Sequence, residues 1–209
     1  MLREPEHSDD DLLRRIIAGE EDAFVCFYRR WQGRIYRFAL HMSGSASVAE
    51  DVTQEAFMSV IRDASRFDPA LGTASAYLFG IARNQVLRRL EKDRALVPFP
   101  EPFEALGDLQ SKAAGNGHQV VYVPPLDLAR KQTIDRVREA VLSLPGHYRE
   151  VVVLCDLQEM SYEEAAAALG CAIGTVRSRL HRARALLAAK LFELRQEEPK
   201  TAARGRGSN

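Results

Sequence analysis

The sequence has few cysteines and no long apolar run, and both absences exclude classes of protein. Its three cysteines, Cys26, Cys155 and Cys171, are an odd number with no C-x-x-C pair, so we expect reduced thiols rather than disulfides or a zinc site. No apolar stretch approaches the length needed to span a bilayer, and the acidic start MLREPEHSDDDLL differs from a secretory signal. We therefore expect a cytoplasmic protein without membrane insertion.

Motifs of catalysis are also missing. The chain has no glycine loop for binding phosphate, no cluster of metal ligands and no pairing of a nucleophile with a base. We therefore expect no catalytic residue, no metal and no cofactor.

The chain has no net charge either, because 29 basic and 29 acidic side chains cancel. This neutrality is an average over segments. Residues 1–94 carry 14 basic and 15 acidic side chains, residues 95–130 carry 2 and 4, and residues 131–209 carry 13 and 10. The positive excess lies at the end, where AIGTVRSRLHRARALLAAK (172–190) has four arginines, one lysine and no carboxylate.

What is present is the composition of a globular protein, with 46% apolar and 28% charged residues in a chain of 209. Prolines and a Gly-Asn-Gly run interrupt any helix within residues 95–130, which predicts a flexible linker between two domains. We expect an all-α protein with helical domains at residues 10–94 and 131–195. The tail from 196 to 209, rich in charge and small residues, is predicted to be disordered.

The first domain shows helical periodicity. Apolar and aromatic residues recur every three or four positions from Phe24 to Met42, which predicts one long helix with a buried face. Ser47 to Glu50 fits a capping box and predicts the start of a second helix. One side of this helix carries Asp51, Gln54, Glu55 and Met58, and from the pattern alone this polar side favours a solvated face.

A third segment combines aromatic and basic residues. A loop with Asp68-Pro69 and Gly72 leads into a predicted helix that mixes Tyr77 and Phe79 with arginines. Aromatic rings stack on unpaired bases and arginines bind phosphates, so this composition suits single-stranded nucleic acid. A core role for the aromatic residues, with solvated arginines, fits the pattern equally well.

The second domain has the spacing of a helix-turn-helix. Ser161 and Glu164 form a second capping box, Gly170 ends that short helix, and the arginine-rich stretch follows after a turn. At 100° per residue, Val176, Leu180, Ala183 and Leu187 form an inward seam and Arg182 points away from it. Such a helix is suited to the major groove of DNA.

These motifs together resemble the extracytoplasmic-function (ECF) sigma factors, the compact two-domain branch of bacterial sigma factors. The resemblance covers roughly residues 10–94 and 132–192. It rests on the stretches AFVCFYRRWQGRIYRFALHMSG, ASVAEDVTQEAFMSVIRDASRFDP, AYLFGIARNQVLRRLEK and LPGHYREVVVLCDLQEMSYEEAAAALGCAIGTVRSRLHRARALL. It implies that the first domain binds the clamp helices of core RNA polymerase and melts the −10 promoter element. The second domain would read the −35 element, and an anti-sigma factor is an expected partner.

The resemblance also assigns residues. The D-x-x-Q-E pattern implies polymerase binding by Asp51, Gln54 and Glu55. The loop from Phe67 to Thr73 corresponds to the one that captures a flipped −10 base. Contacts to −10 DNA are implied for Phe67, Thr73, Tyr77, Arg83, Asn84 and Arg88, and contacts to −35 DNA for Arg149, Thr175, Arg177, Ser178, Arg179 and Arg182.

Three positions depart from the family pattern, since Tyr77 stands where Trp is frequent, Arg88 where an acidic residue is frequent, and Ala172 where Ser is usual. Two other classes of transcriptional protein are alternatives to a sigma factor. A two-domain regulator would need a ligand-binding or phosphoacceptor domain, which residues 23–94 do not resemble. A zinc-binding anti-sigma factor would need a His and Cys cluster, which the sequence lacks.

Overall fold

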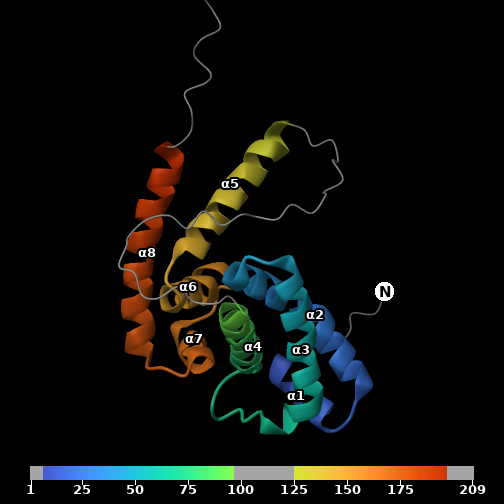
Figure 1. Ribbon diagram of the computed structural model, residues 1–209. Coiled ribbons are helices and arrows are strands. Elements are labelled where there is room, and N and C mark those ends of the chain that lie inside the picture. Colours follow the sequence, from blue (N-terminus) through green and yellow to red (C-terminus); the bar gives the residue numbers. More distant parts are fainter. Residues whose placement is uncertain (1–6, 97–124, 197–209) are drawn as a thin grey trace, which may run out of the picture.

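The computed structural model describes residues 7–96 and 125–196, and all secondary structure in these ranges is helical (Figure 1). The first unit comprises α1 (Asp9–Ile17), α2 (Glu21–Ser43), α3 (Ala46–Asp63), the 3-10 turn η1 (Ala64–Arg66) and α4 (Ala74–Leu96). The second unit comprises α5 (Pro125–Ser143), α6 (Gly146–Val152), the π-helix η2 (Val153–Leu157), α7 (Tyr162–Leu169) and α8 (Ile173–Gln196). The predicted all-α class is confirmed. Most of the predicted linker, residues 97–124, and the tail from 197 onward lie outside the described residues.

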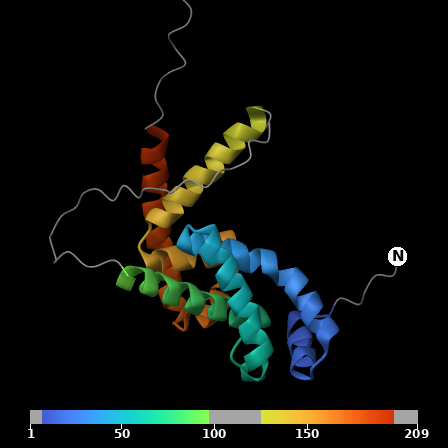
Figure 2. The same cartoon turned by 45° about the vertical axis from the view of Figure 1, so that its right-hand side comes forward.

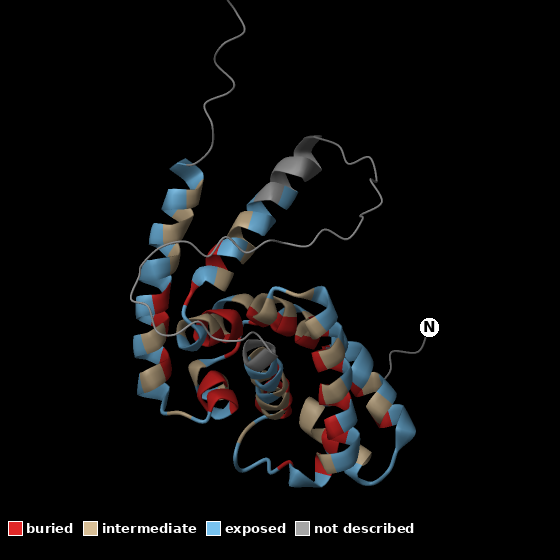
Figure 3. Cartoon of the chain, in the orientation of Figure 1, coloured by how far each residue is buried: buried red, intermediate tan, exposed pale blue. Residues whose placement is uncertain are grey.

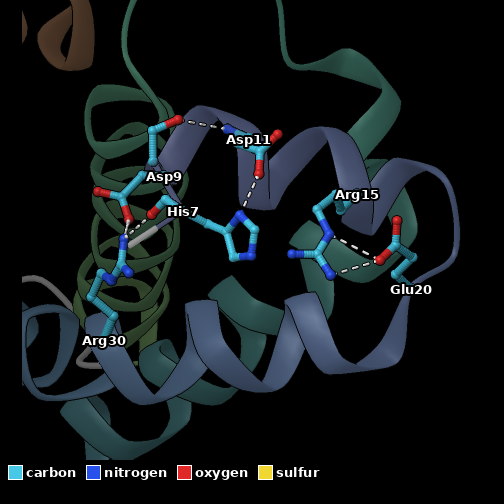
Figure 4. Close-up of polar contacts among 7 residues, drawn as sticks. His7, Asp9, Asp11, Arg15, Glu20 and Arg30 are labelled. Carbon is cyan, nitrogen blue, oxygen red and sulfur yellow. Dashed lines mark hydrogen bonds and ion pairs between the residues drawn. The ribbon is translucent and has the colours of Figure 1, made fainter. Parts of the chain in front are cut away.

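Helix α1 is an element that the sequence pattern did not predict. Ser8 caps it by accepting a hydrogen bond from the Asp11 backbone N–H at 3.1 Å, and its Leu12 and Leu13 are fully buried. Arg30 of α2 forms an ion pair of 2.6 Å with Asp9, the first residue of α1 (Figure 4). Helix α1 is therefore docked on α2 by both apolar burial and charge.

The aromatic stripe predicted for α2 is the centre of the first unit's core. Phe27, Trp31, Ile35 and Phe38 are all buried, and the Phe38 ring meets Phe79 of α4 edge-on at a centroid distance of 5.4 Å. Phe79 is thus a core residue.

The predicted start of the second helix is wrong by two residues. Ser45, not Ser47, is the N-cap of α3, since its hydroxyl accepts a hydrogen bond from the Val48 backbone N–H. The reason lies one residue earlier, where Gly44 ends α2 in the left-handed conformation (φ 74°). That turn brings the chain into α3 directly at Ser45.

The second unit begins earlier than its sequence suggested. Helix α5 starts at Pro125, inside the predicted linker. The prolines were interpreted as helix breakers, but proline is well suited to the first position of a helix. The helix-turn-helix is confirmed. The capping box of Ser161 and Glu164 starts α7, and Gly170 ends it with φ 64°.

The two units pack against each other. Helix α4 lies against α7, and α2 contacts α5, α6 and η2, so the buried side chains of both units form one continuous core (Figure 3). Helices α5 and α8 project from this core in the same direction (Figure 2). Because α7 lies against α4, and α5 and α6 contact α2, the second unit covers part of the first.

Candidate nucleic-acid and polymerase interfaces

Helix α8 presents its arginine-rich side to solvent. Val176, Leu180 and Ala183 are buried as predicted, whereas Arg177 and Arg182 are exposed. Ser178 is exposed as well, and Thr175 and Arg179 are half-buried. Among the described residues, Arg182 has no ion-pair partner, so its guanidinium is available for a ligand. This face offers donors to a DNA groove.

Arg184 lies on the same helix but has a different task. Its guanidinium binds Asp156 of η2 at two points, with Nη2–Oδ1 2.5 Å and Nε–Oδ2 3.1 Å. This hydrogen-bonded carboxylate raises the pKa of Arg184. The stretch 172–190 contains no carboxylate, and the fold supplies Arg184 with one from another element. Arg184 thus fixes α8 against η2.

Arg149 is not an open phosphate contact in this arrangement. Its guanidinium donates to the carbonyls of Met42 (2.6 Å), Leu144 (3.1 Å) and Leu142. Helices α2 and α5 end beside these carbonyls, and the last carbonyls of a helix have no intrahelical donor. Arg149 therefore completes the hydrogen bonding of two helix ends, one from each unit.

Five of the six residues assigned to −10 DNA line one cavity of about 390 Å³, namely Phe67, Thr73, Tyr77, Arg83 and Asn84. The Tyr77 ring lies 5.5 Å from Phe67 between centroids, and its hydroxyl donates to the Asp63 carbonyl at 3.0 Å. Burial raises the pKa of Tyr77, so the hydroxyl keeps its proton. Asn84 is exposed. Arg88 is exposed one turn further along α4, outside the cavity.

The other wall of this cavity comes from the second unit, from residues 167–170 at the end of α7. Arg83 pairs with buried Glu150 of α6, with Nε–Oε1 2.9 Å and Nη2–Oε2 3.3 Å. The hydroxyls of Thr73 and Ser75 donate to Glu164 of α7 at 3.2 and 2.7 Å. Burial raises the pKa of Glu164, but its hydrogen bonds outweigh this and hold that pKa below its ordinary value. Glu164 is therefore an anion in this contact.

The residues assigned to polymerase binding are on one side of α3 but are not equally free. Asp51 pairs with Arg89 of α4 at 2.7 Å, and Glu55 pairs with Arg62 at 2.8 Å. Gln54 is exposed and lines a groove between α2 and α3.

The same groove contains exposed apolar residues, of which the sequence pattern placed Met58 beside Gln54 without giving it a role in binding. Tyr28, Met58 and Ile61 line it with 37%, 43% and 52% of their surface exposed. Met58 and Ile61 follow Gln54 at spacings of four and seven, and this apolar continuation of a polar face is the signal that could have identified them. The groove combines amide, aromatic and apolar groups with four arginines, Arg29, Arg30, Arg34 and Arg37. Aromatic residues, Met and Arg are also enriched at protein interfaces.

Residues 7–96 and 125–196 hold no group of three or more His, Cys, Asp or Glu side chains that could bind a metal ion. Within the same ranges, no helix combines the length and apolar character needed to cross a membrane. The three cysteines are free thiols.

Comparison with known proteins gives two family matches. Residues 27–95 match Sigma-70 region 2, and residues 134–187 match Sigma-70, region 4. The ECF RNA polymerase sigma factor SigM of Mycobacterium tuberculosis (strain ATCC 25618 / H37Rv) is 35% identical over 188 residues, covering 89% of this chain and 86% of SigM. SigE of Mycolicibacterium smegmatis is 35% identical over 159 residues, which is 75% of this chain but only 56% of SigE.

Solved structures are similar over most of the chain. CnrH in complex with the cytosolic domain of CnrY has a TM-score of 0.65 at 26% identity, covering 90% of this chain and 99% of that one. The sigma factor RpoE in complex with the anti-sigma factor NepR from Bartonella quintana has a TM-score of 0.57 at 25% identity, covering 84% and 98%.

Proposed function

The chain belongs to the ECF RNA polymerase sigma factors, which direct promoter-specific transcription initiation, and from that membership we propose which surfaces perform each step. The second unit reads −35 DNA, and the first binds polymerase and melts −10 DNA. The observation that carries this division is the exposed arginine face of α8, presented by a capped helix-turn-helix. The protein acts in the cytoplasm as a regulator and catalyses no reaction itself.

For the −35 element, we assign base edges to Arg182 and the surrounding groove contacts to Thr175, Arg177, Ser178 and Arg179. Arg182 is exposed opposite the buried seam, as a residue that enters a groove must be. Arg149 is assigned to phosphate. Of its three carbonyl partners only Met42 belongs to the first unit, so separation of the two units releases one of these contacts.

For the −10 element, we assign the cavity between the 67–73 loop and α4 to a flipped base. The Tyr77 ring offers a stacking surface on its wall, and exposed Asn84 offers an amide that can bond a base edge. Arg83 and Arg88 would hold the strand's phosphates. A cavity of about 390 Å³ is large enough for one base.

For the polymerase, we assign the groove of α2 and α3 to the clamp helices. Gln54, Met58 and Ile61 line this groove and would contact the partner directly. Asp51 and Glu55 lie on the same helix, α3, outside the groove lining, and would contact the partner beside it. An anti-sigma factor is proposed as a second partner, because RpoE, similar over 84% of this chain, was solved with one.

The decisive experiment adds the purified chain to core RNA polymerase and a library of promoter fragments. The expected result is transcription from a distinct subset of fragments that core polymerase alone does not use. The matched control is the Arg182→Ala variant, which should retain polymerase binding but discriminate less strongly among fragments that differ in the −35 element. Absence of any stimulated transcript, with the polymerase shown to be active with another sigma factor, contradicts the proposal.

A further inference from the structure

The surface proposed for −10 DNA is covered by the protein's own second unit. Helices α6 and α7 place Glu150 on Arg83 and Glu164 on the hydroxyls of Thr73 and Ser75. Residues 167–170 of α7 close one side of the cavity that Tyr77 and Asn84 line. Two of the three first-unit residues in these contacts, Arg83 and Thr73, are assigned to −10 DNA, and the third, Ser75, lies two positions after Thr73.

Two glycines of the first unit lie where α7 approaches it. Gly80 lies on the side of α4 that faces α7, where a Cβ would be 3.6 Å from the Ala168 carbonyl oxygen. A Cβ at Gly72 would lie 3.4 Å from the Ala167 Cβ. Both distances correspond to ordinary van der Waals contact, so both glycines lie directly against α7.

The two carboxylates occupy positions suited to phosphates. A guanidinium is a preferred partner of phosphate oxygens, and the first turn of a helix attracts anions through its free N–H groups. Glu150 is bound to the guanidinium of Arg83. Glu164 lies at the first turn of α4 and accepts from the hydroxyls of Thr73 and Ser75, while the Ala74 N–H at that turn is bound by Asp10. A DNA strand in the −10 cavity would need these same groups.

We propose that the second unit is an internal competitor of −10 DNA, with Glu150 and Glu164 in the places of DNA phosphates. This inference rests on the −10 role given to that surface above. Closure of the units and binding of the −10 strand then exclude each other, so the units must separate before the strand binds.

The test compares the E150Q/E164Q double variant with the full wild-type chain. Glutamine keeps the capping role of residue 164 in α7 and removes the negative charge. The matched control is E139Q/E163Q, because both residues are exposed in the second unit and, among the described residues, neither has a hydrogen bond or ion pair to α4. Neither pair alters a residue assigned to promoter or polymerase binding, so both variants should support transcription with core polymerase.

Two measurements are made on the free proteins. Small-angle X-ray scattering reports whether the units are closed, and fluorescence anisotropy reports the affinity for a fluorescein-labelled single-stranded DNA of random sequence. The double variant should have a larger radius of gyration than the wild type and bind the strand about tenfold more tightly, as expected from the loss of charge-assisted hydrogen bonds. The control should match the wild type in both.

Three results would overturn the proposal. An extended wild-type particle would show that the units are not closed. A double variant that matches the control in both measurements would show that the carboxylates do not hold them. An expanded variant with unchanged strand affinity would remove the competition with DNA, while the sigma activity is judged separately by transcription. If the double variant fails to fold, A167Q replaces it, since a longer side chain there meets the Gly72 loop, and the same two measurements decide.

Discussion

The Arg149 guanidinium and the Met42 carbonyl, 107 positions apart in sequence, are joined by a hydrogen bond of 2.6 Å that links α6 to the end of α2. Two further bonds from the same guanidinium reach the end of α5. One side chain therefore fixes three helices, and the position assigned to DNA from sequence also has a structural role.

Replacing Arg149 should consequently destabilise the free protein. Arg149→Ala leaves three carbonyls without this donor, and we expect a loss of roughly 2–4 kcal/mol in unfolding free energy. Arg149→Lys should recover only part, because one ammonium cannot reproduce the planar fork. Urea unfolding followed by circular dichroism measures this. Arg182→Ala is the control, since an exposed arginine changes stability by about 0.5 kcal/mol or less.

A wild-type unfolding midpoint for Arg149→Ala would show that these bonds contribute nothing to the folded state. The DNA role is tested separately on the holoenzyme. There, loss of a phosphate contact should weaken binding to all sequences alike and lower the salt slope by about one unit.

Arg182 should determine base preference. Because its guanidinium is exposed opposite the buried seam of α8, Arg182→Ala should cost roughly 1–3 kcal/mol of binding to the preferred −35 sequence and relax preference at one or two positions. The measurement is holoenzyme binding to a panel of single-base −35 variants. Arg195→Ala, the same change near the end of the same helix, should leave the preference intact. Wild-type selectivity in Arg182→Ala would remove its recognition role.

The sequence was sufficient where structure follows from local pattern. The buried stripe of α2, the seam of α8 and the capping box at Ser161 each depend on residues within a few turns, so periodicity and spacing predicted them. The cap of α3 was misplaced because Ser45 and Ser47 are both suitable caps. The left-handed Gly44 decides between them.

The contacts between units could not be predicted in the same way. Arg83 and Glu150 are 67 positions apart, and Ser75 and Glu164 are 89 apart. No periodicity relates such pairs, and a chain interpreted as two domains on a flexible linker gives no reason to bring them together. The docking of α1 was missed for a related reason. Its short apolar pair, Leu12 and Leu13, is too short for a periodic pattern, and the pair is buried only because α1 packs against the rest of the first unit.

The polymerase groove gives a prediction in which charge and fold can be separated. Asp51 and Glu55 replaced together by Arg should weaken binding to core polymerase by several kcal/mol if both are buried there. The variant should remain folded, because exposed ion pairs such as Asp51 with Arg89 contribute about 1 kcal/mol or less. Arg89→Gln is the control, since it breaks the same pair but keeps the carboxylate. Unchanged co-purification of the double variant with core polymerase would contradict the assignment.

Tyr77 allows the ring and the hydroxyl to be tested apart in promoter melting. Tyr77→Phe loses only the hydrogen bond to the Asp63 carbonyl and keeps the stacking surface, so it should open −10 DNA nearly as the wild type does. Tyr77→Ala removes the ring, whose stacking on a base is worth roughly 1–3 kcal/mol, and should slow opening by about tenfold or more.

Asn84→Ala should slow opening as well, because the exposed amide at the same cavity no longer contacts the flipped base. Permanganate reactivity of −10 thymines in the holoenzyme complex measures opening, and binding to a −35 duplex should be unchanged in all three variants. Phe67 packs against the Tyr77 ring, so loss of that ring could destabilise the 67–73 loop. Thermal unfolding of each variant is the control, and the unfolding midpoint should stay close to that of the wild type. Normal permanganate reactivity in both Tyr77→Ala and Asn84→Ala would mean that the strand is melted on another surface of the protein.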